Sequence, residues 1–134
     1  MAKFELMNQQ ISYQDPLLPI GIVSNILNIH QRTLRIYDKA GILCPSRTSK
    51  KHRYYSFADV EKGKFIIFLT RKVGLNIIGI KIILNLLSKL AIAPADYQSY
   101  IEKLAEENNI TLVFDEMLAS KRGRPIKLKQ PVES

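Results

Sequence analysis

Residues 29–41 read IHQRTLRIYDKAG, and this stretch predicts a short helix with a basic outer face. At about 100° per residue, one side of the helix is polar and basic, and it is formed by Gln31, Arg32, Arg35 and Lys39. The other side should cover the protein interior, and it is formed by Thr33, Leu34, Ile36, Tyr37 and Ala40. Gly41 is the residue type that ends helices in a left-handed conformation, so we expect a helix over residues 31–40.

A second short helix is expected just before it, over residues 20–27. Its apolar residues recur at one-turn spacing, at Ile22, Val23, Ile26 and Leu27. Asn28 and Ile29 then turn the chain, and His30 can cap the next helix. Two short helices joined by a tight turn form a helix-turn-helix pattern.

The segment after these helices predicts a β-hairpin with a basic tip, because strand-like residues at 43–45 and 53–55 flank a polar, cationic turn. Ser56 and Asp59 then resemble a capping box that opens a helix over about 57–73. Asn76 caps a further helix over about 77–90. This order predicts a mainly α fold, a winged helix-turn-helix with a small β-hairpin wing that is followed by additional helices.

Composition divides the chain into four segments. We expect an N-terminal arm or loop at 1–16, the winged helix-turn-helix domain at 17–90, an acidic helical segment at 94–118 and a basic, disordered tail at 119–134. Pro94 interrupts any continuous helix after Leu90. In the acidic segment, a helix to about residue 108 should place on one face Tyr97, Tyr100, Ile101 and Leu104. Residues 110–114 fit either a strand or the start of another helix.

Charge is distributed unevenly along the 134 residues, which carry a net charge of +8. Residues 17–89 hold thirteen Lys and Arg against three acids, whereas residues 95–116 hold one Lys against six acids. A block of net positive charge suits a polyanion, because each phosphate contact releases condensed counterions. The alternative is a solvated basic surface without a partner.

The sequence lacks the residues that several other classes of function require. The single cysteine, Cys44, excludes a disulfide framework and a Cys-cluster metal or iron–sulfur site, and the isolated His30 and His52 do not predict a zinc site. No Gly-rich phosphate loop and no paired nucleophile and base occur, so we expect neither an enzyme nor a cofactor. The first residues lack the apolar core of a secretory signal, which predicts a cytoplasmic, nucleoid-associated protein without a membrane partner.

The helix expected at 77–90 has more apolar surface than a small domain needs. Its polar stripe is narrow and consists of Lys81, Asn85, Ser88 and Lys89, with Ile78 inside it. Either the C-terminal segment or a second subunit must cover the surplus. We expect a homodimer that buries side chains such as Ile83 and Leu87 in its interface.

Residues 19–90 resemble the DNA-binding domain of MerR-type transcriptional regulators. The resemblance is carried by fragments in order, namely Pro19 to Val23, Thr33 to Asp38, Gly41 to Leu43, Pro45, Arg47-Thr48, Arg53 to Ser56, Asp59-Val60 and Gly74 to Ile80. Residues 29–35 and 74–76 are similar to the HspR group of heat-shock repressors, whereas Pro19 to Val23 and Gly79 to Lys81 are similar to the GlnR group of nitrogen regulators. The HspR resemblance implies a chaperone as co-repressor.

Base readout is expected from the helix at 31–40, because the major groove of double-stranded DNA admits a helix. Arg32 and Arg35 can each offer a guanidinium fork to guanine and Gln31 can pair with adenine, although both arginines can instead touch phosphates. Tyr37 either packs in the core or reaches a phosphate, and Asp38 should orient Arg35. The full set of candidate DNA-binding residues in the helix and wing is Gln31, Arg32, Thr33, Arg35, Tyr37, Arg47, Lys50, Lys51, His52, Arg53 and Tyr54.

The tail contributes two further candidates, Arg122 and Arg124. They lie in the sequence Arg-Gly-Arg-Pro, the core of an AT-hook, whose arginines enter the narrow minor groove of A·T-rich DNA. A merely basic, solubilising tail is the alternative. Together these features predict a dimeric, sequence-specific repressor, or alternatively an architectural, DNA-bending protein without gene-specific regulation.

Overall fold

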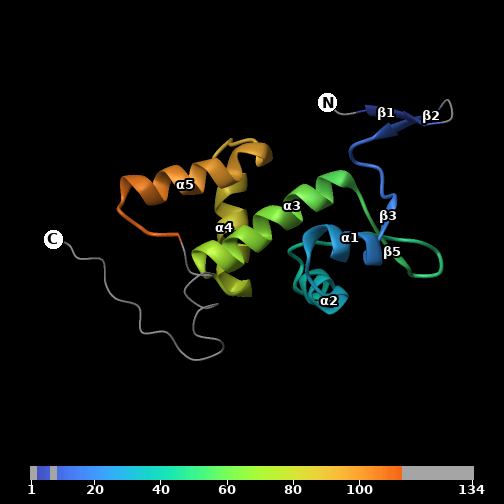
Figure 1. Cartoon of the computed structure of the whole chain (residues 1–134), viewed down its shortest axis with the longest axis horizontal. Coiled ribbons are helices and arrows are strands. Elements are labelled where there is room, and N and C mark those ends of the chain that lie inside the picture. The colour runs from blue at the N-terminus through green and yellow to red at the C-terminus, as the bar shows by residue number, and fades with distance from the viewer. Residues whose placement is uncertain (1–2, 7–8, 113–134) are drawn as a thin grey trace.

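The computed structural model describes residues 3–6 and 9–112 of the chain. It is mainly helical, as expected, and its helices enclose one core (Figure 1). In chain order the elements are β1 (Lys3–Leu6), β2 (Gln9–Ser12), β3 (Leu18–Pro19), α1 (Ile20–Leu27), α2 (Gln31–Ala40), β4 (Ser46–Arg47), β5 (Arg53–Tyr55), α3 (Phe57–Phe68), the π-helix η1 (Leu69–Val73), α4 (Ile77–Ser88), the 3-10 turn η2 (Pro94–Asp96) and α5 (Tyr97–Glu107).

The helix-turn-helix prediction is confirmed at the residue level, since α1 and α2 have the expected bounds. Asn28 ends α1 in the left-handed conformation with φ 57°, and Gly41 ends α2 in the same way with φ 80°. His30 is the N-cap residue of α2, but its side chain makes no capping hydrogen bond.

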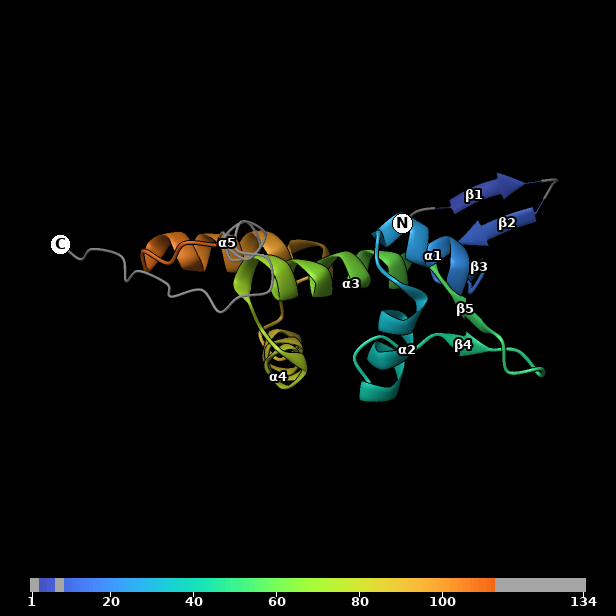
Figure 2. The same ribbon diagram turned by 60° about the horizontal axis from the view of Figure 1, so that its bottom comes forward.

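The β-hairpin wing is confirmed, although its first strand is Ser46–Arg47 instead of residues 43–45, and β3 extends it to a three-stranded antiparallel sheet of order β3-β5-β4. β5 is central: Tyr55 pairs with Leu18, and Tyr54 pairs with both Pro19 and Ser46. The loop between β4 and β5 projects away from the helices (Figure 2). α2 and this wing lie on one side of α3, and α5 lies on the other (Figure 2).

The long helix after the wing begins and ends where the sequence places it. Ser56 Oγ accepts from the backbone N–H of Asp59 at 3.0 Å, while Asp59 Oδ2 accepts from the backbone N–H of Ser56 at 2.9 Å, which completes the capping box. Its last turn widens into η1 before Gly74 ends it with φ 83°. Asn76 then caps α4 by accepting the backbone N–H of Gly79 at 2.8 Å.

The C-terminal helix α5 folds back along α3 instead of extending from α4 (Figure 1). Ala91 turns the chain with φ 56°, and Pro94 opens η2, so the predicted interruption is confirmed. The ring of Tyr97 then packs on that of Phe65 at a centroid distance of 5.4 Å. Of the face predicted for this helix, Tyr97 and Ile101 pack on the core, whereas Tyr100 and Leu104 are exposed.

The expectation for the N-terminal end of the chain is corrected, whereas most of that for the C-terminal end lies outside the described residues. Residues 1–16 do not form a loop throughout, because β1 pairs with β2 in a hairpin with Lys3 opposite Ser12. This pairing rests on backbone hydrogen bonds, which a polar strand without strong alternation does not reveal. Residues 110–112 are neither strand nor helix, and the rest of the segment at 110–114 and the tail at 119–134 lie outside the described residues.

Leu87 was wrongly assigned to the dimer interface. It is buried in the protomer's own core, because it shares with Ile80 the side of α4 that faces α3. Ile83 is half-buried against the same core. The apolar side chains that α4 leaves in solvent are instead Ile78, Ile82 and Leu86.

Candidate nucleic-acid interface

The outward face of α2 carries the side chains that the sequence assigned to it. Gln31, Arg32, Arg35 and Lys39 are exposed, while Leu34 is fully buried beneath them. Arg35 Nη2 donates to Gln31 Oε1 at 3.2 Å, one helical turn apart. This contact orders two polar side chains of the exposed face, so the face presents a guanidinium and an amide side by side.

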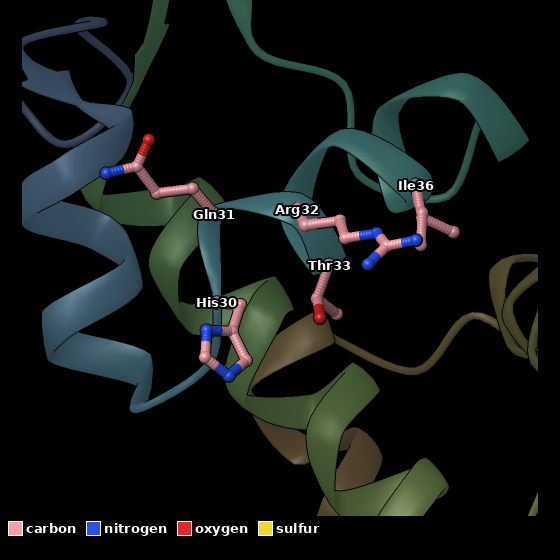
Figure 3. Close-up of a pocket in the computed structure, with 5 residues that line it drawn as sticks. All are labelled: His30, Gln31, Arg32, Thr33 and Ile36. Atoms are coloured by element: carbon pink, nitrogen blue, oxygen red, sulfur yellow. The ribbon is translucent and has the colours of Figure 1, made fainter.

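A shallow depression lies at the N-terminal end of α2 and is lined by His30, Gln31, Arg32, Thr33 and Ile36 (Figure 3). The Arg32 side chain extends alongside Ile36, whereas Gln31 points away toward α1 (Figure 3). Ile36 was wrongly placed in the interior, because 48% of it is exposed at the edge of the basic face. An apolar side chain beside an arginine there can contact a thymine methyl group while the arginine approaches a neighbouring base.

Two residues of α2 turn away from the exposed face. Tyr37 is only 6% exposed, so core packing is its role in the structure. Asp38 does not orient Arg35, contrary to expectation. Its Oδ2 accepts instead from Arg47 Nη2 at 2.6 Å and from Arg53 Nε at 2.9 Å, because the wing places both arginines beside this flank of α2.

The tip of the wing is a tight, polar turn. The backbone N–H of Thr48 donates to the carbonyl of His52 at 3.0 Å, and that of Lys51 donates to the carbonyl of Thr48 at 2.8 Å. Lys51 adopts φ 65°, a left-handed conformation. Lys50, Lys51 and His52 are all exposed, so three of the predicted wing residues are free to approach a nucleic acid backbone.

The strands of the wing hold their candidates more tightly. Arg47 and Arg53 lie opposite each other across β4 and β5, and both are engaged by Asp38. Tyr54 is half-buried on the central strand. These three residues therefore have structural contacts, and their contact with DNA stays a prediction.

Tyr55 is the buried anchor of the wing. It is fully buried, and burial, reinforced by the nearby charge of Asp38, raises the pKa of its hydroxyl to about 12. The hydroxyl has no hydrogen-bond partner among the residues that the structure describes. A neutral phenol therefore fills this part of the core at all ordinary pH values.

Arg71 is a candidate that sequence reasoning missed. It comes from η1, and its Nη2 lies 3.5 Å from the carbonyl oxygen of Asn28 in the turn between α1 and α2. It lines a second depression together with His30 and Thr33. Because Arg71 is 43 positions from Asn28, no local pattern could have connected them.

The remaining predicted site residues, Arg122 and Arg124, lie outside the described residues. Within residues 3–6 and 9–112, no three His, Cys, Asp or Glu side chains are grouped as a metal site would require. None of the helices in that part of the chain is long and apolar enough to cross a membrane.

Comparison with known proteins gives a consistent set of relatives. The chain is 32% identical over 82 residues to the heat shock protein HspR of Streptomyces coelicolor, which is 61% of this chain and 54% of HspR. It is 41% identical over 69 residues to the transcriptional regulator GlnR of Bacillus anthracis, which is 52% of this chain and 53% of GlnR. The chain thus spans about half the length of the curated relatives it matches.

A solved structure, that of a MerR-family transcriptional regulator from Bacillus cereus, aligns with a TM-score of 0.47 at 20% identity and covers 81% of this chain and 86% of the other. The model of the MerR helix-turn-helix family of regulatory proteins matches residues 18–87, which include α1, α2, the wing, α3 and nearly all of α4. Since that match spans more than half of the chain, the protein belongs to the MerR family of helix-turn-helix regulatory proteins.

Proposed function

We propose that this MerR-family regulator is a repressor that binds an inverted-repeat operator in double-stranded DNA as a homodimer. The observation that carries the proposal is that α2 and the wing lie next to each other (Figure 2) and that both expose cations, namely Arg32 and Arg35 on α2 and Lys50 and Lys51 on the wing tip. A helix in the major groove with a basic hairpin on the flanking backbone separates base readout from phosphate contact. Repression requires only that the bound protein occupy a promoter.

The exposed side of α4 supports the proposal of a two-fold dimer. Ile78, Ile82 and Leu86 are 62%, 54% and 53% exposed, and they recur every fourth residue along one side of the helix. Each side chain of this kind that an interface buries contributes about 1.5–3 kcal/mol. A two-fold axis would place the two α2 helices on half-sites about one turn of DNA, or a multiple of one turn, apart.

Selection of bound duplexes from a random library tests this proposal. We expect an enriched inverted repeat that the protein binds at least about a thousandfold more tightly than random DNA at physiological salt. Equal affinity for selected and random duplexes, combined with bending of both, would instead identify an architectural protein. Transcription from a promoter that contains the repeat should fall when the protein is added.

The exposed part of α5 is the place where we propose that a co-regulator binds. Tyr100 and Leu104 lie in solvent next to Glu102 and Glu106, which gives the helix an apolar and acidic surface. A chaperone is the partner class that we propose, because the resemblance of residues 29–35 and 74–76 to the HspR group implies one. Purified Hsp70-type chaperone should bind the protein and lose this binding in the variant Leu104→Glu, with Lys103→Glu as the exposed control.

The tail is proposed to add a second contact. If Arg122 and Arg124 enter the minor groove, removal of residues 119–134 should weaken binding more on A·T-rich flanks than on G·C-rich flanks. Two operators with identical half-sites and different flanks provide the comparison. An equal loss on both would mean that the tail attracts phosphates of any sequence.

A further inference from the structure

A single carboxylate oxygen on α2 binds two neighbouring strands of the wing, the edge strand β4 and the central strand β5. Asp38 Oδ2 lies 2.6 Å from Arg47 Nη2 on β4 and 2.9 Å from Arg53 Nε on β5. The side chain of Asp38 is only 12% exposed, so the two guanidinium groups and the surrounding chain shield it from water. Charge-assisted hydrogen bonds with this geometry are stronger than those between neutral groups.

The position of Asp38 would otherwise be unfavourable. It lies in the last turn of α2, where the helix dipole favours cations over anions. It also borders the basic face proposed to meet phosphates, which an anion repels. Arg47 and Arg53 are themselves directly opposite each other in the strand register, where two like charges destabilise a sheet. The pairing of one carboxylate with both arginines offsets two of these penalties, namely the repulsion of phosphates by Asp38 and the repulsion between Arg47 and Arg53. The unfavourable interaction of Asp38 with the helix dipole remains.

The sheet of the wing contacts α1 and α3 through β5, whereas its side-chain hydrogen bonds to α2, among the described residues, are those of Asp38. β4 has two residues and β5 has three, and of these only Tyr55 is buried. The tip at 48–52 is exposed throughout. β3 holds the base of the sheet through Leu18 and Pro19, which precede α1 and not α2.

We propose that Asp38 is a positioning residue that locks the wing to the recognition helix, so that α2 and the wing tip meet one DNA duplex in a fixed relation. In this proposal Arg47 and Arg53 bind Asp38, and Lys50 and Lys51 make the phosphate contacts of the wing. The proposal rests on the proposed function for its effect on DNA, although the lock itself exists in the free protein.

The test compares Asp38→Asn with Glu61→Gln. Both variants remove one negative charge, but Glu61 lies exposed on α3, where its ion pair among the described residues is with Lys64 at 3.3 Å. Affinity is measured for the selected operator and for random duplex at two salt concentrations. We expect Asp38→Asn to weaken the operator complex about tenfold and to leave random DNA unchanged or slightly tighter. Glu61→Gln should tighten both complexes by the same small factor.

One result would contradict the proposal. If Asp38→Asn tightens operator and random DNA alike, as Glu61→Gln does, Asp38 acts only as a repelling charge and the proposal is wrong. A second variant locates the effect: Arg47→Gln should weaken the operator as Asp38→Asn does, and the double variant should be no worse than either. Additive losses would mean that Arg47 contacts DNA independently of Asp38, which also contradicts the proposal.

A measurement on the free protein separates the lock from the DNA-binding function. In NMR spectra, Asp38→Asn should lower the backbone order parameters of residues 46–55 and abolish the protection of the Arg53 Nε–H from exchange with water, while α1 stays unchanged. Unchanged spectra would refute the lock even if the wild type binds its operator. Loss of order in the variant, together with a wild type that shows no preference for any duplex, would retain the lock and refute the proposed function.

Discussion

The helix-turn-helix with its wing and the α4–α5 region expose opposite chemistry. The first exposes cations on α2 and on the wing tip, and its exposed apolar side chains on α1 and α2, namely Ile22, Ile26 and Ile36, lie beside a core that contains Leu34 and Tyr55. The second exposes a row of isoleucine and leucine side chains on α4 and acidic side chains on α5. A surface of cations suits a polyanion, whereas an exposed apolar stripe suits a protein. We therefore expect the two regions to have different partners.

The largest expected effect lies in the apolar region. Ile82→Glu places a charge in the stripe of α4 and should weaken dimerisation at least about a hundredfold, because each subunit loses a buried side chain and buries a carboxylate. Sedimentation at micromolar concentration should show only the 15.3 kDa protomer for the variant. Ser88→Glu adds the same charge to an exposed, polar part of α4 and should leave the dimer intact. A dimer that tolerates Ile82→Glu would place the interface elsewhere.

The basic region should respond in a different measurement, namely affinity for DNA. Arg32→Ala should cost about 1–3 kcal/mol of binding free energy on the operator and relax the base preference at one position of each half-site. Arg35→Ala should do the same if its guanidinium reads a base, or weaken all duplexes equally if it touches a phosphate. Lys103→Ala on α5 removes one positive charge on the other side of α3 and is the control.

The wing tip should show a smaller and less selective effect. Lys50→Ala or Lys51→Ala should weaken operator and random DNA about equally and reduce the salt slope of binding by roughly one each. Titrations at several salt concentrations measure this slope directly. A change in base preference in these variants, without one in the α2 variants, would reverse the division of tasks between helix and wing.

The last effect concerns the stability of the fold at Tyr55, where the central strand of the wing meets the core. Because the pKa of Tyr55 is raised to about 12, folding favours the neutral phenol. The associated stability is fully present below the unfolded pKa near 10 and is lost as pH rises toward the folded value, by up to about 2 kcal/mol. Urea unfolding at pH 8 and pH 11 should show a larger loss of stability in the wild type than in Tyr55→Phe.

At neutral pH the same variant should be as stable as the wild type or more stable by up to about 1 kcal/mol, because the buried hydroxyl has no partner among the described residues. A large loss of stability at pH 8 would show that the hydroxyl is hydrogen-bonded in solution.

Local signals explain why the sequence predicted so much of the fold. Left-handed residues such as Gly41 and caps such as Ser56 act within four residues, so the bounds of α1 and α2 and the start of α3 follow from the chain itself. The exposed residues of the basic face follow from helical periodicity for the same reason. Helical periodicity alone predicted wrongly that Ile36 is buried and that Leu87 belongs to a dimer interface. Periodicity shows which residues share a side of a helix, but not which other elements pack against that side.

The amino-acid sequence by itself therefore determined the order of the helices, the basic face of α2 and the cationic hairpin of the wing, but not the strands β1, β2 and β3. Only the tertiary structure decided which partners the charged side chains have, since Asp38 meets Arg47 and Arg53 across nine and fifteen positions and Arg71 meets Asn28 across 43. It also decided which apolar residues of α4 stay in solvent, because that depends on how α3 and α5 pack on the helix. Caps and periodicity act between near neighbours in the chain, whereas these contacts exist only after distant segments have been packed together.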